Sequence, residues 1–535
     1  MTDATGSEER RRPSLAARFF GYWLPTLLVL ALVGGAFAAH RYELGPRWLG
    51  WKGDDAVNAC GAPGGKSIAS RSSCHPAAVD PPEGLDLPDL VPASPVAEPV
   101  LDGGPADPAL VREALAPYLG DNDLGKHVAV AVAELGGGTP VFGTADELAT
   151  PASTMKLVTS AAALAALGPD RTFETSVVAG RSPQQIVLVG GGDPFLASKP
   201  LPPEVRDLTY PRRADVRTLA KKVAAKLVKQ GRRSVKLAYD DTLFTGPTAS
   251  PQWQPDYIAD AIVSPITALW VDNGEPASGL GRVADPSAYA ADVFAQELAA
   301  AGVKVVGAPT KQAAPPSAAK LGTVESAPVL QIVERLLDVS DNEAAEVLAH
   351  HVGIAEIGEG SFAGGSKGVV AVLQDLGVTL SAKEKVYDGS GLSRKNRLTT
   401  ATLLAVLRVA ASESHPELRS LITGMPVAGF TGSLTDRFDS GAPEGRGLVR
   451  AKTGTLSAAG VHGLAGVVTD KDGTLLSFVA IADQVAVADA LDARDTIDKM
   501  AAALAGCHCT ETPTAAETPS ETPTGSPSES PTDTP

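Results

Sequence analysis

The segments that favour β-strands lie towards the two ends of this chain, and this arrangement constrains its fold most. An early strand is predicted at His127–Glu134, with a hairpin partner at Pro140–Gly143. Three late strands are predicted at Leu448–Lys452, Val461–Thr469 and Thr474–Ile481. Predicted helices lie between or after them, at Met155–Leu167, Val329–Leu337, Asn342–Val352, Val369–Leu376, Thr400–Ala411 and Ala486–Leu504. We therefore expect an α/β domain built from both ends of the chain, with an insertion between its parts.

The expected insertion has elements of its own. Short strands are predicted at Ile186–Val189 and Val235–Ala238, and a basic amphipathic helix at Val216–Lys229 with Asp215 as its N-cap. The expected organisation is a membrane segment at 1–40, a Pro/Gly-rich linker at 41–105, a main domain at 106–170 and 330–506, an insertion at 171–329 and a tail at 507–535.

Composition excludes some functions and leaves room for a large core. Hydrophobic residues make up 44% of the 535 residues, and the formal net charge is −16. A chain this acidic is a poor candidate for binding nucleic acid, which requires a clustered positive surface. Part of the charge lies in the segment from Thr510 to Pro535, which has five acidic residues and no basic or aromatic residue. We expect that tail to be disordered.

The N-terminus has the features of an export signal. Four arginines, at positions 10–12 and 18, precede an uncharged run from Phe19 to Ala39. As a helix this run would reach roughly 32 Å, enough to cross a bilayer core of about 30 Å. The arginines favour an N-terminus inside and the remainder outside. The run is either a retained anchor or a signal peptide cleaved after Ala36-Phe37-Ala38, and the bulk is exported in both cases.

The four cysteines flank the main domain: Cys60 and Cys74 precede it, and Cys507 and Cys509 follow it. An oxidising exported compartment favours disulfides, and three pairings are open. A bridge from the first pair to the second would tie the chain ends together. A metal site that uses Cys74-His75 and Cys507-His508-Cys509 is the alternative, although this spacing matches no familiar zinc pattern.

Three short motifs occur in order along the chain. They are Ser153-Thr154-Met155-Lys156, Ser340-Asp341-Asn342 and Lys452-Thr453-Gly454-Thr455. Ser153 opens a predicted helix, which places Lys156 one turn later on the same face. A serine hydroxyl needs a base, and lysine can serve only if its pKa falls from about 10.4 towards 7. Burial, the helix N-terminus and a second cation such as Lys452 would all lower it.

Each motif also has a simpler interpretation. Ser153 could be a plain N-cap, Ser340-Asp341-Asn342-Glu343 could be a capping box, and Lys452-Thr453-Gly454 could be a turn. The apolar residues before Lys452 favour an edge strand, whose backbone could bind an extended peptide. A second S-x-x-K, at Ser317–Lys320, follows two prolines and precedes no predicted helix, so we interpret it as a decoy. Ser366 lies in a G-x-S-x-G pattern with no buried strand before it, and we interpret it as a helix cap.

Taken together, the motifs resemble the serine acyl-transfer set of penicillin-binding proteins and class A β-lactamases. From about Asp107 to Leu504 the chain resembles the class C low-molecular-mass penicillin-binding proteins, the D-alanyl-D-alanine carboxypeptidase/endopeptidases. Segments similar to family signatures are VGGGDP (189–194), YDDTLF (239–244), SDNEAAE (340–346), YDGSGLSRKNRLT (387–399), MPVAGFTGSL (425–434) and RAKTGTL (450–456). The 187 residues from Ser153 to Ser340 resemble the family's insertion of extra domains. Thr242 and Phe430-Thr431 depart from the family pattern.

The resemblance implies a β-lactamase-like transpeptidase fold, an antiparallel sheet flanked by helices, with an inserted accessory region. It implies that Ser153 attacks the penultimate D-alanine carbonyl of a peptidoglycan stem peptide. The other implied roles are Lys156 as base, Ser340 as proton relay, Asn342 as positioning group, Lys452 as positive field, and Thr453, Gly454 and Thr455 as the substrate-binding strand. The N–H groups of Ser153 and Thr455 would hold the oxyanion. β-Lactams would acylate Ser153, and neither a metal nor an organic cofactor is implied.

Two other functions remain open at this point. A serine β-lactamase would need fast deacylation, normally through a placed carboxylate and water, and the long insertion argues against it. A penicillin-sensing or wall-binding protein would keep the fold for recognition without turnover. The intact set of Ser153, Lys156, Ser340, Asn342 and Lys452 argues against that function.

Overall fold

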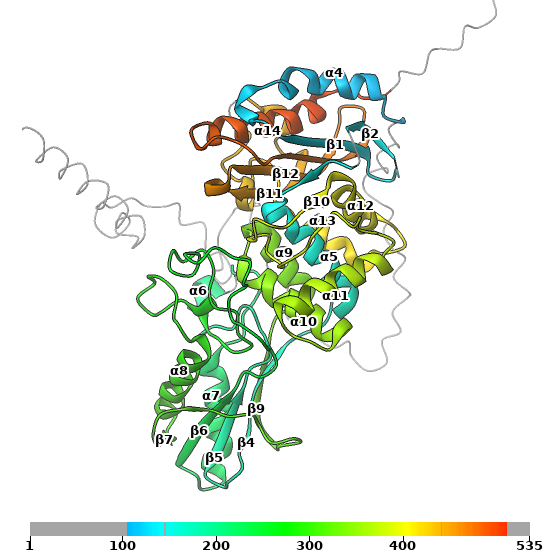
Figure 1. Ribbon diagram of the computed structural model, residues 1–535. Coiled ribbons are helices and arrows are strands. Elements are labelled where there is room, and N and C mark those ends of the chain that lie inside the picture. The colour runs from blue at the N-terminus through cyan, green and yellow to red at the C-terminus, as the bar shows by residue number, and fades with distance from the viewer. Residues whose placement is uncertain (1–103, 138, 144–145, 207, 440, 511–535) are drawn as a thin grey trace, which may run out of the picture. The chain divides into compact units, whose positions relative to one another are not determined.

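The computed structural model describes residues 104–510, except 138, 144, 145, 207 and 440. Its main sheet is antiparallel and has the order β11-β12-β13-β1-β2 (Figure 1). The strands are β1 (Val128–Glu134), β2 (Pro140–Gly143), β11 (Val449–Leu456), β12 (Val461–Thr469) and β13 (Leu475–Ala482). The early strand β1 lies between its hairpin partner β2 and the late strand β13, and Val128 pairs with Ala482. The sheet is therefore built from both ends of the chain, as predicted.

Helices cover both faces of this sheet because its strands are apolar on both sides. In β1, Ala129, Ala131 and Ala133 belong to one core, and Val130 and Val132 belong to the other. Helices α4 (Pro108–Leu119) and α14 (Ala490–Gly506) pack on the valine face (Figure 1). The alanine face packs on α5 (Met155–Leu167), α9 (Val329–Val339), α10 (Asn342–Ile357), α11 (Phe362–Asp375), α12 (Thr400–Ala411) and α13 (Arg419–Thr423).

A second sheet is built from the middle of the chain. Its order is β7-β6-β5-β4-β9, and β8 also pairs with β6. The strands are β4 (Glu174–Ala179), β5 (Gln185–Val189), β6 (Ser234–Asp240), β7 (Lys304–Val305), β8 (Thr310–Lys311) and β9 (Lys320–Glu325). Strands β5 and β6 are parallel, and α7 (Val216–Lys229) connects them as the crossover helix. The apolar faces of α7 and α8 (Pro286–Ala300) pack on this sheet. The short helix α6 is Pro203–Arg206, and β3 (Leu148–Ala149) pairs with β10 (Leu398–Thr399).

Several predicted elements are confirmed with the same bounds. These are the segments 155–167, 216–229, 400–411 and 461–469, and Asp215 caps α7 by accepting from Thr218 N. Helix α14 begins at Ala490 rather than Ala486, because a 3₁₀ turn at Val487–Asp489 precedes it. The elements that were not predicted are α4, α6, α8, α13, β3, β4, β7, β8, β9 and β10.

Helix α11 begins seven residues earlier than its apolar pattern predicts. Its first turns contain Gly364, Gly365 and Gly368, which lower the intrinsic helix propensity. Those glycines let α11 lie close to α10, since a Cβ on Gly365 would lie 2.8 Å from the carbonyl oxygen of Ala349. The interpretation of Ser366 as a helix cap is wrong. Its Oγ donates to the Phe362 carbonyl within the helix, and Ser361 is the N-cap.

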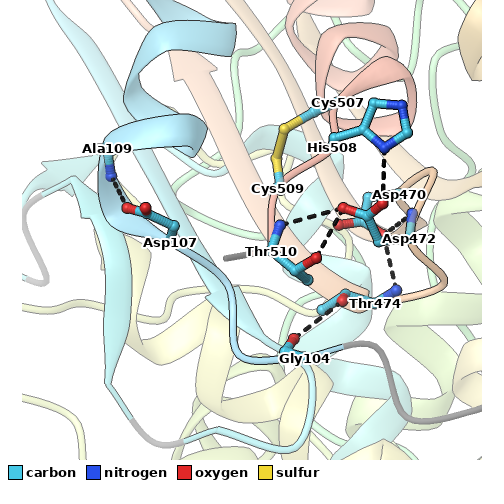
Figure 2. Close-up of a disulfide and its surroundings, with 10 residues drawn as sticks. All are labelled: Gly104, Asp107, Ala109, Asp470, Asp472, Thr474, Cys507, His508, Cys509 and Thr510. Carbon is cyan, nitrogen blue, oxygen red and sulfur yellow. Dashed lines mark hydrogen bonds and ion pairs between the residues drawn. A yellow bond between two sulfur atoms is a disulfide. The ribbon is translucent and has the colours of Figure 1, made fainter. Parts of the chain in front are cut away.

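The two ends of the described chain meet beside a disulfide (Figure 2). Cys507 is bonded to Cys509, which excludes a bridge from either residue to Cys60 or Cys74 and removes two thiolates from the alternative metal site. The ends are joined by hydrogen bonds instead, since Asp107 N donates to Cys509 O at 2.8 Å. Asp472 accepts from Thr510 Oγ1 at 2.9 Å and lies 2.7 Å from His508 Nδ1 (Figure 2).

Other predictions fall outside the described residues. These are the anchor or signal at 19–39, most of the linker at 41–105, Cys60, Cys74 and the tail beyond Thr510. Within the part of the chain that the structure describes, every helix is too short or too polar to span a bilayer.

Candidate active site

Ser153 lies in a tight turn that is held by its surroundings. A 3₁₀ turn at Ala152–Thr154 leads directly into α5. Ala152 has a φ of 47°, in the left-handed region that non-glycine residues rarely adopt. Gly391 packs so closely against this turn that a Cβ on it would lie 1.8 Å from the Ala152 carbonyl oxygen. The turn therefore fixes the backbone on which Ser153 is presented.

Lys156 contacts Ser153 and two further acceptors. Its Nζ lies 2.9 Å from Ser153 Oγ, 2.8 Å from Asn342 Oδ1 and 2.7 Å from the Ser390 carbonyl oxygen. The side chain is fully buried. An ammonium has three N–H donors, so these three contacts account for its donors, and one of them is the candidate nucleophile.

Ser340 and Lys452 form a second pair at the same site. Lys452 Nζ donates to Ser340 Oγ at 2.8 Å and to the Thr453 carbonyl oxygen at 3.0 Å. The capping-box interpretation of Ser340 is wrong, because Asp341 is the N-cap of α10 and accepts from Ala344 N. Ser340 ends α9 with a φ of 59°, which frees its hydroxyl to contact Lys452.

Strand β11 brings the Lys-Thr-Gly motif to Ser153 as the edge of the main sheet, as predicted. Residues 426–428 cover its first half, through hydrogen bonds to Val449 and Ala451. Gly454 allows close approach, since a Cβ there would lie 2.9 Å from the Pro151 carbonyl oxygen. Beside the strand, Ser433 Oγ lies 3.1 Å from Thr453 Oγ1.

A cleft of about 410 Å³ opens above these groups. Its lining includes the predicted residues Ser153, Ser340, Asn342, Thr453 and Thr455, together with Tyr257, Ile262, Leu392, Arg394, Leu456, Ser457 and Ala458. Lys156 and Lys452 reach it through Ser153 and Ser340, and Gly454 lies in the strand at its edge. The structure thus brings all eight predicted site residues to one place, and Ser317 is not among the lining residues.

One wall of the cleft comes from the inserted part of the chain. The Ile262 carbonyl accepts from Asn342 Nδ2 at 2.9 Å, which orients the amide so that Oδ1 faces Lys156. Ser264 N donates to Glu343 Oε1 at 3.0 Å, so the segment is also attached to the first turn of α10. Tyr257 belongs to an apolar cluster of the insertion that packs on α10 and α11.

Burial lowers the pKa of both lysines, and nearby charges act on the two in opposite directions. Burial lowers the pKa of Lys156 to about 8, and the carboxylates of Glu346 and Asp388 oppose this change. Burial, and then the charges of Lys156 and Arg437, lower the pKa of Lys452 well below its usual value. The environment therefore makes a neutral amine accessible near neutral pH, which a base next to a serine requires.

Sequence reasoning missed the groups that act through the backbone or from the insertion. They include Ile262, Glu346, Asp388 and Ser390. The only available signal was the position of the last three within the segments SDNEAAE and YDGSGLS.

Comparisons with known proteins identify the family of this chain. A model of the D-Ala-D-Ala carboxypeptidase 3 (S13) family matches residues 111–280 and 273–504. A carboxypeptidase of Mycobacterium tuberculosis is 35% identical over 75% of this chain and 84% of its own length. The carboxypeptidase DacB of Mycolicibacterium smegmatis is 34% identical over 67% of this chain and 76% of its own length.

A solved structure shows the same fold. Penicillin-binding protein 4 of Haemophilus influenzae is similar with a TM-score of 0.59 and 21% identity, over 72% of this chain and 98% of that protein. The same protein has been solved in complex with a β-lactam, with a TM-score of 0.56 to this chain.

Proposed function

The chain belongs to the D-Ala-D-Ala carboxypeptidase 3 (S13) family, and we propose that it cleaves D-alanyl-D-alanine bonds of peptidoglycan stem peptides through an acyl-enzyme on Ser153. It is a serine-type carboxypeptidase/endopeptidase. One observation carries the assignment of the site: the buried amine of Lys156, with its lowered pKa, lies 2.9 Å from Ser153 Oγ.

In the first step, neutral Lys156 accepts the hydroxyl proton while Ser153 Oγ forms a bond to the carbonyl carbon. The N–H groups of Ser153 and Thr455 stabilise the oxyanion. The C–N bond then breaks, and the leaving amine takes the proton that Lys156 accepted, by way of Ser340 Oγ, which contacts Lys452, so Lys156 is neutral again. Water hydrolyses the ester and releases Ser153.

The terminal carboxylate of the substrate fits the edge of β11. Thr453 and Thr455 line the cleft there, and the Thr453 hydroxyl is flanked by Ser433 and Lys452. The second half of β11, beyond the part that residues 426–428 cover, also offers backbone donors and acceptors to an extended peptide. β-Lactams fit the same site as covalent inhibitors, since their carbonyl and carboxylate mimic the scissile bond and its C-terminus.

The lining of the cleft favours a peptidase over a β-lactamase. None of the described residues that line it is an aspartate or glutamate, and the nearby carboxylates of Glu346 and Asp388 accept backbone N–H groups of the loop instead of opening onto the cleft. We expect the penicillin adduct to persist after excess penicillin is removed, as followed by intact-mass spectrometry. Rapid loss of the adduct mass would instead support a β-lactamase.

Export and membrane attachment are supported by the sequence alone. The arginines before Phe19 and the apolar run to Ala39 favour a domain outside the membrane, held by an N-terminal helix or released after cleavage. Fractionation of cells that express the full chain, with N-terminal sequencing of the product, separates the two cases. A product found in the cytosol would contradict both.

The decisive experiment compares two serine variants of the purified protein with wild type. Ser153→Ala should abolish release of D-alanine from a peptide ending in D-Ala-D-Ala and should abolish penicillin labelling, with an unchanged circular dichroism spectrum. Ser317→Ala should behave as wild type, because Ser317 lies in an exposed turn outside the cleft. Labelling of the Ser153→Ala protein would refute the assignment, and tight binding of the peptide by wild type without turnover would support the sensing function.

A further inference from the structure

Glu346 is a buried carboxylate that the steps above do not use. It follows Asn342 by four residues on α10, so both side chains leave the same face of the helix. Its Oε1 accepts from Ser390 N at 2.8 Å, and its Oε2 accepts from Gly389 N at 3.0 Å. The carbonyl of the same Ser390 accepts from Lys156 Nζ at 2.7 Å.

We propose that Glu346 is a positioning residue for Lys156, acting through the backbone of Gly389 and Ser390. The inference rests on the acyl-transfer function proposed above. Of the three acceptors around Lys156 Nζ, the Ser390 carbonyl is the only one supplied by a loop backbone. A loop carbonyl keeps its place only if the peptide groups beside it are held. Glu346 holds the peptide that precedes it.

The rest of the loop has a separate support. Asp388 accepts from Gly391 N at 3.0 Å and from Ser393 N at 2.6 Å, so it holds the residues after Ser390. The two carboxylates therefore hold opposite sides of the Ser390 carbonyl. Loss of Glu346 would release the loop backbone before the Ser390 carbonyl, on the side that faces α10. Asp388 would still hold the backbone after it, so the loop would shift without unfolding.

The charges around Lys156 give a second argument for the role of Glu346. The groups that face Lys156 are Asp341, Glu343 and Glu346 from the start of α10, Asp388 from the loop, and Lys452 from β11. Among the carboxylates, Glu346 raises the pKa of Lys156 most, in opposition to burial. Burial, and then the charge of Asp388, raise the pKa of Glu346 to about 8, in opposition to the hydrogen bonds from Gly389 and Ser390. The attraction to Lys156 acts on both groups, so it favours the ionised carboxylate while Lys156 carries its proton. Glu346 thus affects both the place and the charge of the base.

The test measures the rate constant of acylation by a fluorescent penicillin across pH in the full-length protein. In Glu346→Gln, the amide can accept from only one of the two N–H groups, so we expect acylation about 10- to 100-fold slower with full final labelling. The acidic limb of its pH profile should move to lower pH, because a negative charge beside Lys156 is lost. Glu346→Asp should be acylated similarly slowly, because its side chain is too short to reach the N–H groups of both Gly389 and Ser390. The acidic limb of its pH profile should stay at the wild-type pH, because the negative charge is kept.

Asp240→Asn is the matched control. Asp240 also braces a loop, through Thr242 N and Ala314 N, but it lies in the second sheet. It should acylate at the wild-type rate. If Glu346→Gln does not fold, Gly389→Ala replaces it, since a Cβ there would lie 2.7 Å from the Ala345 carbonyl oxygen and displace the loop with Glu346 intact.

A Glu346→Gln rate within twofold of wild type, or an equal loss in Asp240→Asn, would overturn the proposal. For the substitute variant Gly389→Ala, a wild-type rate would do so. Failure of the wild-type protein itself to be acylated or to release D-alanine would refute the proposed function instead, so the two failures are distinct.

Discussion

Trp253 Nε1 donates a hydrogen bond of 2.8 Å to Asp388 Oδ2, which attaches the inserted segment to the loop that carries Ser390. Both side chains are buried. The insertion is therefore more than an appended module. It contributes Tyr257 and Ile262 to the cleft, and its indole N–H is one of the donors that stabilise the carboxylate of Asp388.

Trp253→Phe should weaken both the fold and the site. It removes the N–H donor and leaves a buried carboxylate oxygen with one partner fewer, at a cost of about 1–3 kcal/mol in the free energy of unfolding. Because the loop also positions the Ser390 carbonyl, acylation by penicillin should slow. Trp270→Phe is the control, since Trp270 Nε1 donates to the Asp193 carbonyl away from the loop. It should lose stability but keep its acylation rate, and equal slowing in both variants would contradict the prediction.

The rate constant of acylation by penicillin should rise as the pH is raised through about 8. Lys156 must be neutral to accept the proton, and its pKa in the folded protein is about 8. Stopped-flow acylation between pH 6 and 10, with circular dichroism as a check on folding, measures this limb. A flat profile across that range would mean that another group is the base.

The same pKa has a consequence for stability. Between about 8 and the ordinary value of 10.5, the unfolded chain binds a proton at Lys156 that the folded chain does not. The contribution of this residue to the free energy of unfolding therefore rises with pH across that window and is unfavourable below it.

Gly454→Ala should separate β11 from the turn that presents Ser153. The new Cβ would lie 2.9 Å from the Pro151 carbonyl oxygen and 3.2 Å from Thr154 Cγ2, so the strand or the turn must move. We expect acylation to fall at least about tenfold, since small misplacements of reacting groups have large effects on rate. Gly136→Ala, which meets nothing within 4 Å, is the control. A wild-type rate in Gly454→Ala would show that the close approach does not matter.

Local patterns were enough to find the reacting groups. Ser153 and Lys156 are one helical turn apart, and the apolar residues before Lys452 form the predicted edge strand. The partners of these groups were not predictable in this way. Ile262 and Ser390 act through carbonyl groups, which any residue type supplies, and each is more than seventy residues from its partner along the chain.

The wrong assignments also have physical causes. The start of α11 was missed because its glycines have a low helix propensity. Their role is to allow the close contact between α11 and α10. The capping-box alternative for Ser340, which the ordered motifs had outweighed, fails because the neighbouring Asp341 takes the cap. At α11 tertiary contacts override a local preference, whereas at α10 one local cap replaces another.

The position of β1 in the main sheet has a consequence for biosynthesis. Val128 pairs with Ala482, so β1, an interior strand of the sheet, has no neighbour on one side until nearly the whole described region has been made. A polypeptide that emerges N-terminus first must keep β1 from pairing wrongly throughout that interval. A nascent chain that ends before β13 would lack the sheet on which the cleft rests, so we expect no acylation by penicillin until β13 has been made.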